Sequence, residues 1–505
     1  MAFTTTRRSA LMLLMSPGLA FRYGGPVSAS ARNAIVSPSS GDLAEDSVWA
    51  HRGRWDPVFE LPNVAIHTSV LPNGKVLFWG RRDQPTGSMH EPECTPYIWN
   101  PNTGELTATP QPKRADGTTV NLFCSGHAFL PDGRLLVAGG HVTDGDGLDQ
   151  ACVYDCRINT WTALPVMNER RWYPTATALP DGTVLVSAGS YKDNGRVVIN
   201  DVPQIWDGHR WTATTRVTGV PLYSRMHIAP SGQVFISGPD AGPSVMYDAW
   251  KVIYIGGSNA AEVIDLRANP QARREIASMH FPRRHHNATV LADGSVLVTG
   301  GTRGSGFNDL SPDKPVHVAE LWDPVTKEWK ELAGEDVDRC YQATAVLLPD
   351  ATVLSAGSGE FVVGGRPNDA RDSHRNGQIF RPPYLFHGPR PEIVSAPAEV
   401  AYGETFSLQI SGPDVGKVIW IRLPSVTHAL DQSQRINVLE FRRGDGGVTI
   451  AAPQRPEICP PGHYMLFVLS KAGVPSVARI MRIDSPAAHP RAQGRFKFDR
   501  RGRWC

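Results

Sequence analysis

The sequence predicts an all-β protein in which a ring of seven β-sheets is followed by a smaller β-sandwich. Three observations support this prediction. A hairpin pattern recurs seven times, a strand pair that usually carries a tryptophan lies between the hairpins, and the pattern changes after about residue 385. Nothing in the chain has the long 3.6-residue periodicity of amphipathic helices, so we do not expect helices to build the core.

Each hairpin is a β-rich run, a tight turn and a second β-rich run that ends in glycine. The clearest turns are P-D-G and P-N-G, which supply the positive φ that a tight hairpin needs. The trailing glycines allow close backbone approach or a bulge. The seven stretches are 66–80, 126–140, 174–189, 225–238, 244–257, 287–301 and 338–359.

The second strand pair occurs at 97–106, 153–161, 205–211 and 321–329. One repeat therefore holds four strands over roughly 50 residues, which is typical of a kelch-type β-propeller blade. Seven hairpins predict a seven-bladed propeller over residues 48–385. The turn at Gly232 is followed too soon by the next hairpin near Asp248. Either one blade is incomplete there or the chain carries a deletion.

Residues 388–484 contain short alternating strands and predict an immunoglobulin-like sandwich. The last segment, 485–505, is basic and has no strand pattern, so we expect a flexible tail. The charge of +2 is close to balance and gives no indication of a nucleic-acid partner. The seven cysteines cannot all pair within one chain, so at least one is free or has another role.

Residues 1–31 are typical of a bacterial export signal. Arg7 and Arg8 precede a short apolar stretch, and Ala29–Ala31 offer an A-x-A cleavage site. The arginine pair favours the twin-arginine route, and a general secretory signal is the alternative. We therefore expect a periplasmic or extracellular protein. No later segment is long and apolar enough to span a bilayer.

Several separate motifs resemble, in family order, those of the galactose oxidase and glyoxal oxidase family of copper-radical oxidases. They are NLFCSGHAFLPDG, ERRWYPTATALPDG, CYQATAVLLPD, SVTHALDQSQR and GHYMLFVLSKAGVPSVA. The resemblance covers about residues 50–484. The carbohydrate-binding domain that precedes the propeller in galactose oxidase has no counterpart in the sequence.

The resemblance implies a copper centre with a radical cofactor. Cys124 would form a thioether with the ring of Tyr173, which would be an equatorial copper ligand and the seat of the radical. Tyr341 would be the axial ligand and the proton acceptor, and His428 would reach the centre from the C-terminal domain. Nitrogen and oxygen donors suit copper(II). Because alcohol oxidation removes two electrons and copper takes one, the tyrosyl radical would take the other.

Two further residues follow from the same resemblance. Tyr191 lies where the family stacks an aromatic ring over the thioether, and Arg283 lies where it places a substrate-contacting arginine. Taken alone, a residue of any of these types is more often an ordinary structural side chain. This holds for Tyr191 and Arg283 and also for Cys124, Tyr173, Tyr341 and His428. The order and local context of the motifs favour an inherited site.

Gln342 departs from the family pattern, in which a histidine ligand follows the tyrosine. A neutral amide oxygen is a weak copper ligand compared with imidazole. Three alternatives stay open. Gln342 binds through its oxygen or through a water, a nearby histidine (His127, His285 or His286) substitutes, or the site has decayed.

Two functions follow from these observations. The first is an exported oxidase that oxidises a primary alcohol or an aldehyde while O2 is reduced to H2O2. Its substrate would be a small molecule or a carbohydrate. The second is a non-catalytic propeller that binds a carbohydrate or a protein through its loops. Cys124 and Tyr173 favour the enzyme, whereas Gln342 and the short blade favour the binding protein. Either would be a monomer without a membrane span, and the fold alone does not choose between them.

Overall fold

The computed structural model describes residues 42–238, 242–268, 271–363, 366–367, 369–444 and 446–484. The predicted export signal and basic tail lie outside the described residues. Within them, no helix is long and apolar enough to cross a membrane.

Seven β-sheets form a ring in the described part of the chain, as predicted. The first strands of most neighbouring sheets contact one another on the inner side of the ring. The first three sheets contain β3 (His67–Val70), β4 (Val76–Trp79), β5 (Tyr97–Trp99) and β6 (Leu106–Ala108); β7 (Gly126–Phe129), β8 (Leu135–Ala138), β9 (Ala151–Asp155) and β10 (Thr160–Ala163); and β11 (Trp172–Ala178), β12 (Val184–Asp193), β13 (Arg196–Ile199), β14 (Gln204–Trp206) and β15 (Trp211–Ala213).

The remaining sheets follow the same plan with one exception. The fourth has two strands in the described residues, which agrees with the predicted incomplete blade. The sheets contain β16 (Met226–Ile228) and β17 (Val234–Ile236); β18 (Ser244–Asp248), β19 (Lys251–Ile255), β20 (Ala261–Asp265) and β21 (Ala272–Glu275); β22 (Asn287–Val290), β23 (Val296–Thr299), β24 (Val318–Trp322) and β25 (Trp329–Gly334); and β26 (Ala343–Leu347), β27 (Val353–Gly357), β30 (Asn376–Arg381), β1 (Arg54–Trp55) and β2 (Phe59–Glu60).

The N-terminal strands close the ring. β1 and β2 both pair with β30, so the first strands of the described chain form the outer edge of the last blade. The sequence did not predict the helix that precedes them, α1 (Asp42–Arg52), whose Trp49 packs against Phe386. Phe386 belongs to a short turn of helix, η2 (Pro383–Phe386). A second one, η1 (Ala370–Asp372), follows the small hairpin β28 (Val362–Val363) and β29 (Arg366–Pro367).

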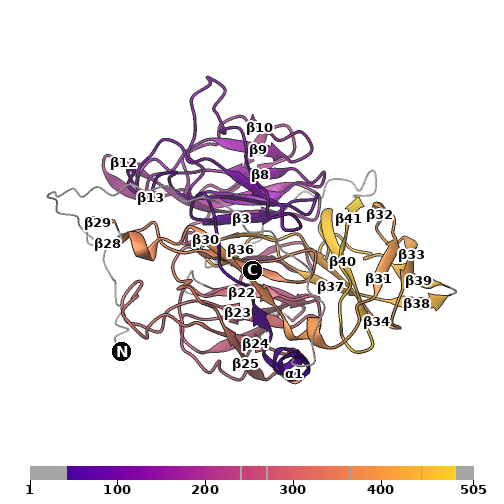
Figure 1. Cartoon of the computed structure of the whole chain (residues 1–505). Coiled ribbons are helices and arrows are strands. Elements are labelled where there is room, and N and C mark those ends of the chain that lie inside the picture. The colour runs from indigo at the N-terminus through magenta and orange to yellow at the C-terminus, as the bar shows by residue number, and fades with distance from the viewer. Residues whose placement is uncertain are drawn as a thin grey trace, which may run out of the picture.

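The C-terminal sandwich consists of two sheets that lie to one side of the propeller in Figure 1. Its core is a separate apolar cluster that includes Phe406, Trp420 and Leu466. One sheet contains β31 (Glu392–Ser395), β33 (Thr405–Ser411), β39 (Gly447–Ala451) and β38 (Phe441–Gly444). The other contains β32 (Glu399–Ala401), β41 (Arg479–Asp484), β40 (Gly462–Ser470), β34 (Val415–Arg422) and β37 (Ile436–Leu439).

One hairpin of the C-terminal domain enters the propeller. β35 (Ser425–Thr427) pairs with β3, opposite His67–Ser69, and β36 (Leu430–Asp431) returns beside it. Figure 1 accordingly shows β36 among the propeller sheets and far from β38. His428 and Ala429 form the turn with φ of 49° and 60°, the two positive values of a type I′ hairpin. The chain thus carries His428 to the centre of the ring.

The segment after this hairpin is bonded to the inner propeller strands. The Gln432 Oε1 atom accepts hydrogen bonds from the N–H groups of His127 and Ala176, at 3.3 and 2.7 Å. The Gln434 Oε1 atom accepts one from Val290, at 3.1 Å. Blades two, three and six are therefore fixed to the segment that carries His428.

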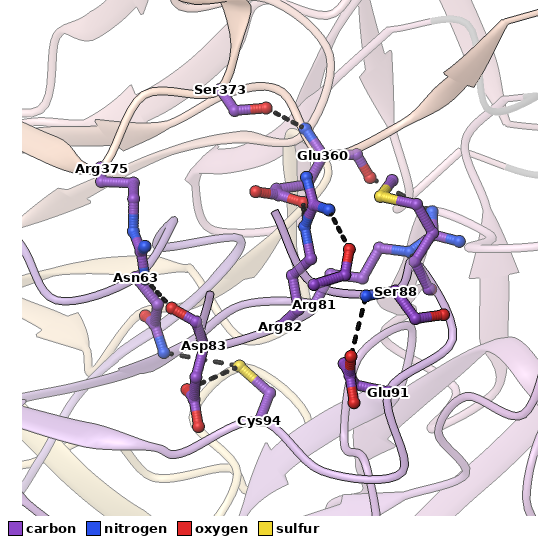
Figure 2. Close-up of polar contacts among 12 residues, drawn as sticks. Asn63, Arg81, Arg82, Asp83, Ser88, Glu91, Cys94, Glu360, Ser373 and Arg375 are labelled. Atoms are coloured by element: carbon purple, nitrogen blue, oxygen red, sulfur yellow. Dashed lines mark hydrogen bonds and ion pairs between the residues drawn. The ribbon is translucent and has the colours of Figure 1, made fainter. Parts of the chain in front are cut away.

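The seam between the last and the first blade contains a buried ion pair (Figure 2). Arg82 Nε lies 2.5 Å from Glu360 Oε2, and both side chains are almost completely buried. Arg81, the preceding residue, donates to the Glu360 carbonyl at 3.2 Å. Arg375 donates from the last blade to the carbonyl groups of Pro62 and Asp83. Charged groups thus join the last blade to the first, in addition to the strands β1 and β2.

Glu360→Gln is expected to weaken the fold by about 3–5 kcal/mol, because it leaves the buried Arg82 guanidinium without its counter-charge. Denaturant unfolding followed by tryptophan fluorescence measures this loss. The matched control is Asp155→Asn, which removes the partner of the mostly exposed Arg157 and should cost less than about 1 kcal/mol. Equal losses in the two variants would contradict the role of the seam.

Candidate metal centre

Three side chains from distant parts of the chain meet at the centre of the ring. The Tyr173 Oη atom lies 2.5 Å from Tyr341 Oη and 2.7 Å from His428 Nε2. Tyr173 is on β11, Tyr341 lies just before β26, and His428 is at the tip of the inserted hairpin. The structure therefore brings together the three predicted ligands, two phenol oxygens and one imidazole nitrogen.

The other nitrogen of His428 is fixed by its neighbour. Nδ1 lies 2.6 Å from the Thr427 hydroxyl oxygen. If this nitrogen carries the proton and donates it to Thr427, the Nε2 lone pair faces Tyr173 and can bind a metal. Burial, and then the positive charge of neighbouring groups, holds the pKa of His428 well below its usual value, so the ring is neutral at pH 7.

Cys124 is completely buried beside the Tyr173 ring. Its carbonyl accepts the Tyr173 N–H at 2.8 Å. Burial raises the pKa of the Cys124 thiol well above its usual value, although the Arg81 charge and a hydrogen bond with the Tyr173 side chain act in the opposite direction. The thiol is therefore protonated at pH 7 and lies in contact with the ring to which it was predicted to be joined.

Two aromatic rings stack on Tyr173. The Trp172 ring centroid is 3.6 Å away with an interplanar angle of 4°, and the Tyr223 centroid is 4.3 Å away with an angle of 23°. Two rings at such distances can only occupy opposite faces of Tyr173. The Tyr223 hydroxyl donates to the Ser125 carbonyl at 3.0 Å, which fixes its ring. Tyr173 is thereby shielded on both faces.

Backbone strain is concentrated at this centre. Cys124, Tyr173, Tyr223, Gln342 and His428 all have left-handed φ values, between 47° and 68°. Non-glycine residues in this region cost about 1–3 kcal/mol each and persist where the surrounding structure holds them. Such strain is typical of functional sites, where it sets the direction of side chains.

Parts of the chain match known domain families, and longer stretches are similar to named oxidases. Residues 390–483 match the galactose oxidase-like, early set domain, and residues 283–334 match the kelch motif. Galactose oxidase of Gibberella zeae is 27% identical over 500 residues, covering 85% of this chain and 70% of its own length. An aldehyde oxidase of Vitis pseudoreticulata is 26% identical over 539 residues, covering 85% and 97%.

The chain is similar to the galactose oxidase-like family. A solved fungal alcohol oxidase in complex with copper has the same fold, with a TM-score of 0.74 and 24% identity over 86% of this chain and all of that one. The named relatives are oxidases, and this solved structure contains copper.

The donor set of this galactose oxidase-like chain fits copper. Two phenol oxygens and an imidazole nitrogen converge, and copper(II) favours such oxygen and nitrogen donors. Gln342 is 2% exposed, and its Oε1 atom has no hydrogen-bond partner among the described residues. An orphaned oxygen next to Tyr341 in sequence is compatible with a weak fourth ligand. The described residues contain no cluster of three or more His, Cys, Asp and Glu, which is consistent because the donors are mainly tyrosines.

The three histidines considered as substitutes for a second imidazole differ in position. Both ring nitrogens of His127 are already hydrogen-bonded, to His67 and Ser425, so neither is free to bind a metal. His286 is completely buried, and its pKa is lowered by burial and by the Arg283 charge. Only His285 of the three has a described ring contact with a candidate ligand, 5.0 Å from the Tyr341 centroid.

The prediction that Arg283 contacts substrate is wrong. Its side chain is completely buried, 2.5 Å from Glu320, and donates to the carbonyl groups of Gly300 and Val318. Arg171 and Arg339 occupy the corresponding positions of two other blades and bond similarly to nearby carbonyls. This arginine is thus a repeated structural element of the galactose oxidase-like propeller, with no guanidinium surface open to a ligand.

Tyr191 was predicted to stack over the Cys124–Tyr173 pair, and it does not do so in this structure. Tyr191 lies on β12 with Arg170 over its ring, at 5.6 Å, whereas Trp172 and Tyr223 cover Tyr173. A usable signal for Trp172 was its position directly before Tyr173. Two adjacent residues of a regular strand point to opposite faces, so Trp172 would not be expected to stack on Tyr173. The stacking depends on the left-handed φ of Tyr173, which the sequence pattern does not reveal.

Two more residues near the centre were missed. Arg81 is buried with its guanidinium 4.9 Å from the Phe123 ring centroid, and it bonds Asp144 at 2.8 Å. Its charge lowers the pKa values of Cys124 and Tyr341 against the larger effect of burial. His67 accepts the Cys124 N–H at 3.0 Å. Both lie in the first blade, in segments where the sequence shows only an ordinary hairpin.

Proposed function

We propose that the protein is a copper-radical oxidase that converts a primary alcohol or an aldehyde into its oxidised product while O2 is reduced to H2O2. The observation that carries the proposal is the convergence of Tyr173, Tyr341 and His428, with the Cys124 thiol against the Tyr173 ring. Tyr173, Tyr341 and His428 would hold the copper, with Gln342 as a weak fourth ligand. The metal would accept one electron from the substrate, and the radical on the neighbouring tyrosine would accept the second.

The cross-link would form in a balanced oxidation. A carbon–sulfur bond forms between Cys124 and the Tyr173 ring, and one S–H and one C–H bond break. The two electrons and two protons that are released reduce one O2 to H2O2. Contact between a buried thiol and a ring stacked on both faces favours reaction at this ring only.

Tyr341 is placed to accept a proton from the substrate. Its Oη lies 2.5 Å from Tyr173 Oη, and its N–H donates to the Asn308 side chain at 3.3 Å. Phe307 contacts the Tyr341 ring, with centroids 4.6 Å apart, and is 53% exposed. A depression of about 670 Å³ lies beside these residues, lined in part by Asn308, Leu310, Phe361 and Arg371. We infer that substrate reaches Tyr341 from this side.

The alternative function is a non-catalytic propeller that binds carbohydrate or protein. The observation in its favour is Gln342, which gives the centre an amide where the family pattern has imidazole. We propose export from the cytoplasm for either function, on the basis of the Arg7–Arg8 segment, and a monomeric state. Copper binding decides between the oxidase and the alternative.

Copper affinity is expected to rise with pH. Burial raises the pKa values of Tyr173 and Tyr341 well above the usual value, so both phenols are neutral near pH 7 without metal. Each phenol that binds as a phenolate releases one proton, and affinity then rises by up to about tenfold per pH unit for each proton. Titration of the purified protein with Cu²⁺ at several pH values, against a competing chelator, measures the slope, and the absorption spectrum reports phenolate binding.

Tyr341→Phe is the control for this titration. It removes one phenol and should lower the slope by one proton per copper if Tyr341 binds as a phenolate. A pH-independent affinity in the parent protein would contradict phenolate ligation, and no copper binding at any pH would favour the non-catalytic propeller.

A further inference from the structure

A chain of buried polar side chains runs behind Cys124. His67 Nε2 accepts the Cys124 N–H at 3.0 Å, and His67 Nδ1 lies 3.1 Å from His127 Nε2. His127 Nδ1 lies 2.5 Å from Ser425 Oγ, which lies 3.0 Å from Ser69 Oγ. All four side chains have no exposed surface. They come from β3, β7 and β35, so the chain joins two blades to the inserted hairpin.

The geometry permits one arrangement of protons for neutral rings. A backbone N–H can only donate, so His67 Nε2 carries no proton and the proton of this ring is on Nδ1. His67 then donates to His127 Nε2, and His127 donates from Nδ1 to Ser425. Burial lowers the pKa of His127 to about 3 and that of His67 well below its usual value, in agreement with two neutral rings.

The His67 ring is also fixed in orientation. It stacks on Trp79 at 4.9 Å with an interplanar angle of 5°, and Trp79 in turn donates from Nε1 to the Leu122 carbonyl at 3.0 Å. A ring held by one stacking partner and two hydrogen bonds has no freedom to turn. Its Nε2 lone pair is therefore a fixed acceptor for the backbone of Cys124.

Cys124 needs such an acceptor. Its φ of 63° is unfavourable for a residue with a Cβ atom, and its N–H group is buried. His67 holds the N–H, while the Tyr173 N–H holds the Cys124 carbonyl at 2.8 Å. The residue is thus held on both sides, in the conformation that places its thiol against the Tyr173 ring.

We propose that His67 is a positioning residue for thioether formation: it fixes Cys124 in the left-handed conformation from which sulfur and the Tyr173 ring can be joined, and His127 fixes its tautomer. The inference rests on the proposed function, because it assumes that the cross-link forms. His67 makes no described hydrogen bond to Tyr173, Tyr341 or His428, although its ring centroid lies 5.9 Å from that of His428. We therefore expect its main effect on the rate of joining, and copper affinity is measured alongside.

The test uses the full protein, produced without copper and with its thiols reduced, and then treated with Cu²⁺ in air. Intact-mass measurement follows the loss of two hydrogens with time. His67→Leu removes the acceptor at similar volume and should slow this loss by at least about tenfold while copper affinity changes little. His67→Gln places an amide oxygen near the former Nε2 position and should restore most of the rate. The matched control is His227→Leu, which removes another buried histidine bonded to a serine, far from Cys124 in sequence.

The outcomes separate the two hypotheses. A parent protein that never loses the two hydrogens overturns the proposed function and this inference together. A parent that loses them, with His67→Leu equally fast or with His227→Leu equally slow, overturns the inference alone. If His67→Leu does not fold, His67→Asn replaces it, because its shorter amide does not reach the Cys124 N–H. Equal rates for His67→Asn and His67→Gln would then overturn the inference.

Discussion

Treatment of the purified protein with copper in air is expected to remove two hydrogens and to link Cys124 to Tyr173. The thiol is completely buried against the ring, and the Tyr173 hydroxyl lies within hydrogen-bonding distance of two other candidate ligands. The Tyr173 N–H donates a hydrogen bond to the Cys124 carbonyl at 2.8 Å, so the two backbones are already held side by side. Intact-mass measurement detects the loss, and peptide mapping locates the link.

Two cysteine variants make this expectation specific. Cys124→Ser should abolish the mass change and the peroxide production that depends on it. Cys340→Ser is the matched control, since Cys340 is as completely buried and directly precedes Tyr341. It should leave the mass change intact. An unlinked Cys124 and Tyr173 after copper treatment, in a protein that is folded and has bound copper, would count against a radical site.

The ring of sheets could be predicted because its information is local. Each blade begins with a hairpin whose turn needs positive φ, and glycine after aspartate or asparagine supplies it, as at Gly133 and Gly182. The incomplete fourth blade was visible for the same reason, since the spacing leaves no room for two more strands. Helix α1 was missed because it is short, with few apolar residues to give a period.

The centre itself was predictable only in part. The resemblance of motifs named Cys124, Tyr173, Tyr341 and His428, and the structure brings them together. Periodicity alone could not do so, because 255 residues separate Tyr173 from His428. Their contact depends on β35 leaving the sandwich to pair with β3, a long-range pairing that no local pattern encodes.

The misassigned residues show where a linear comparison fails. Arg283 stands at a position that looks functional in one motif, yet arginines at the matching positions of other blades bond backbone carbonyls in the same way. Comparison of the repeats with one another would have indicated a structural role. Trp172 stacks on Tyr173, and His67 accepts a hydrogen bond from Cys124. Both Tyr173 and Cys124 have left-handed φ values, which are set by tertiary contacts and not by local sequence.

The largest gain in function is expected from Gln342→His. Gln342 directly follows Tyr341, and its buried Oε1 atom has no partner among the described residues. An imidazole would offer copper a second nitrogen donor at the position that the family pattern uses for one. The substitution adds no formal charge at neutral pH and changes the side-chain volume little. Since even changes beyond the directly bound ligands alter metal affinity about 10–100-fold, we expect copper to bind at least that much more tightly.

The matched control for this substitution is Gln342→Leu. It also removes the orphaned amide, so any gain in stability from relieving a buried unsatisfied oxygen appears in both variants. Only the histidine variant should gain copper affinity, measured by chelator competition. Peroxide production with small primary alcohols or aldehydes should rise with it, from a weak level in the parent protein.

The competing outcomes identify what Gln342 does. A parent protein that is already a fast oxidase, and is slowed by Gln342→His, would mean that the amide is an adapted part of the mechanism. If neither form binds copper, Tyr173, Tyr341 and His428 are relics of an ancestral centre, and the non-catalytic propeller gains support. If Gln342→His binds copper tightly and becomes an oxidase, the remaining ligands are correctly placed and the loss of one imidazole limits the protein. The distances of 2.5 and 2.7 Å that join the three ligands lead us to expect this last result.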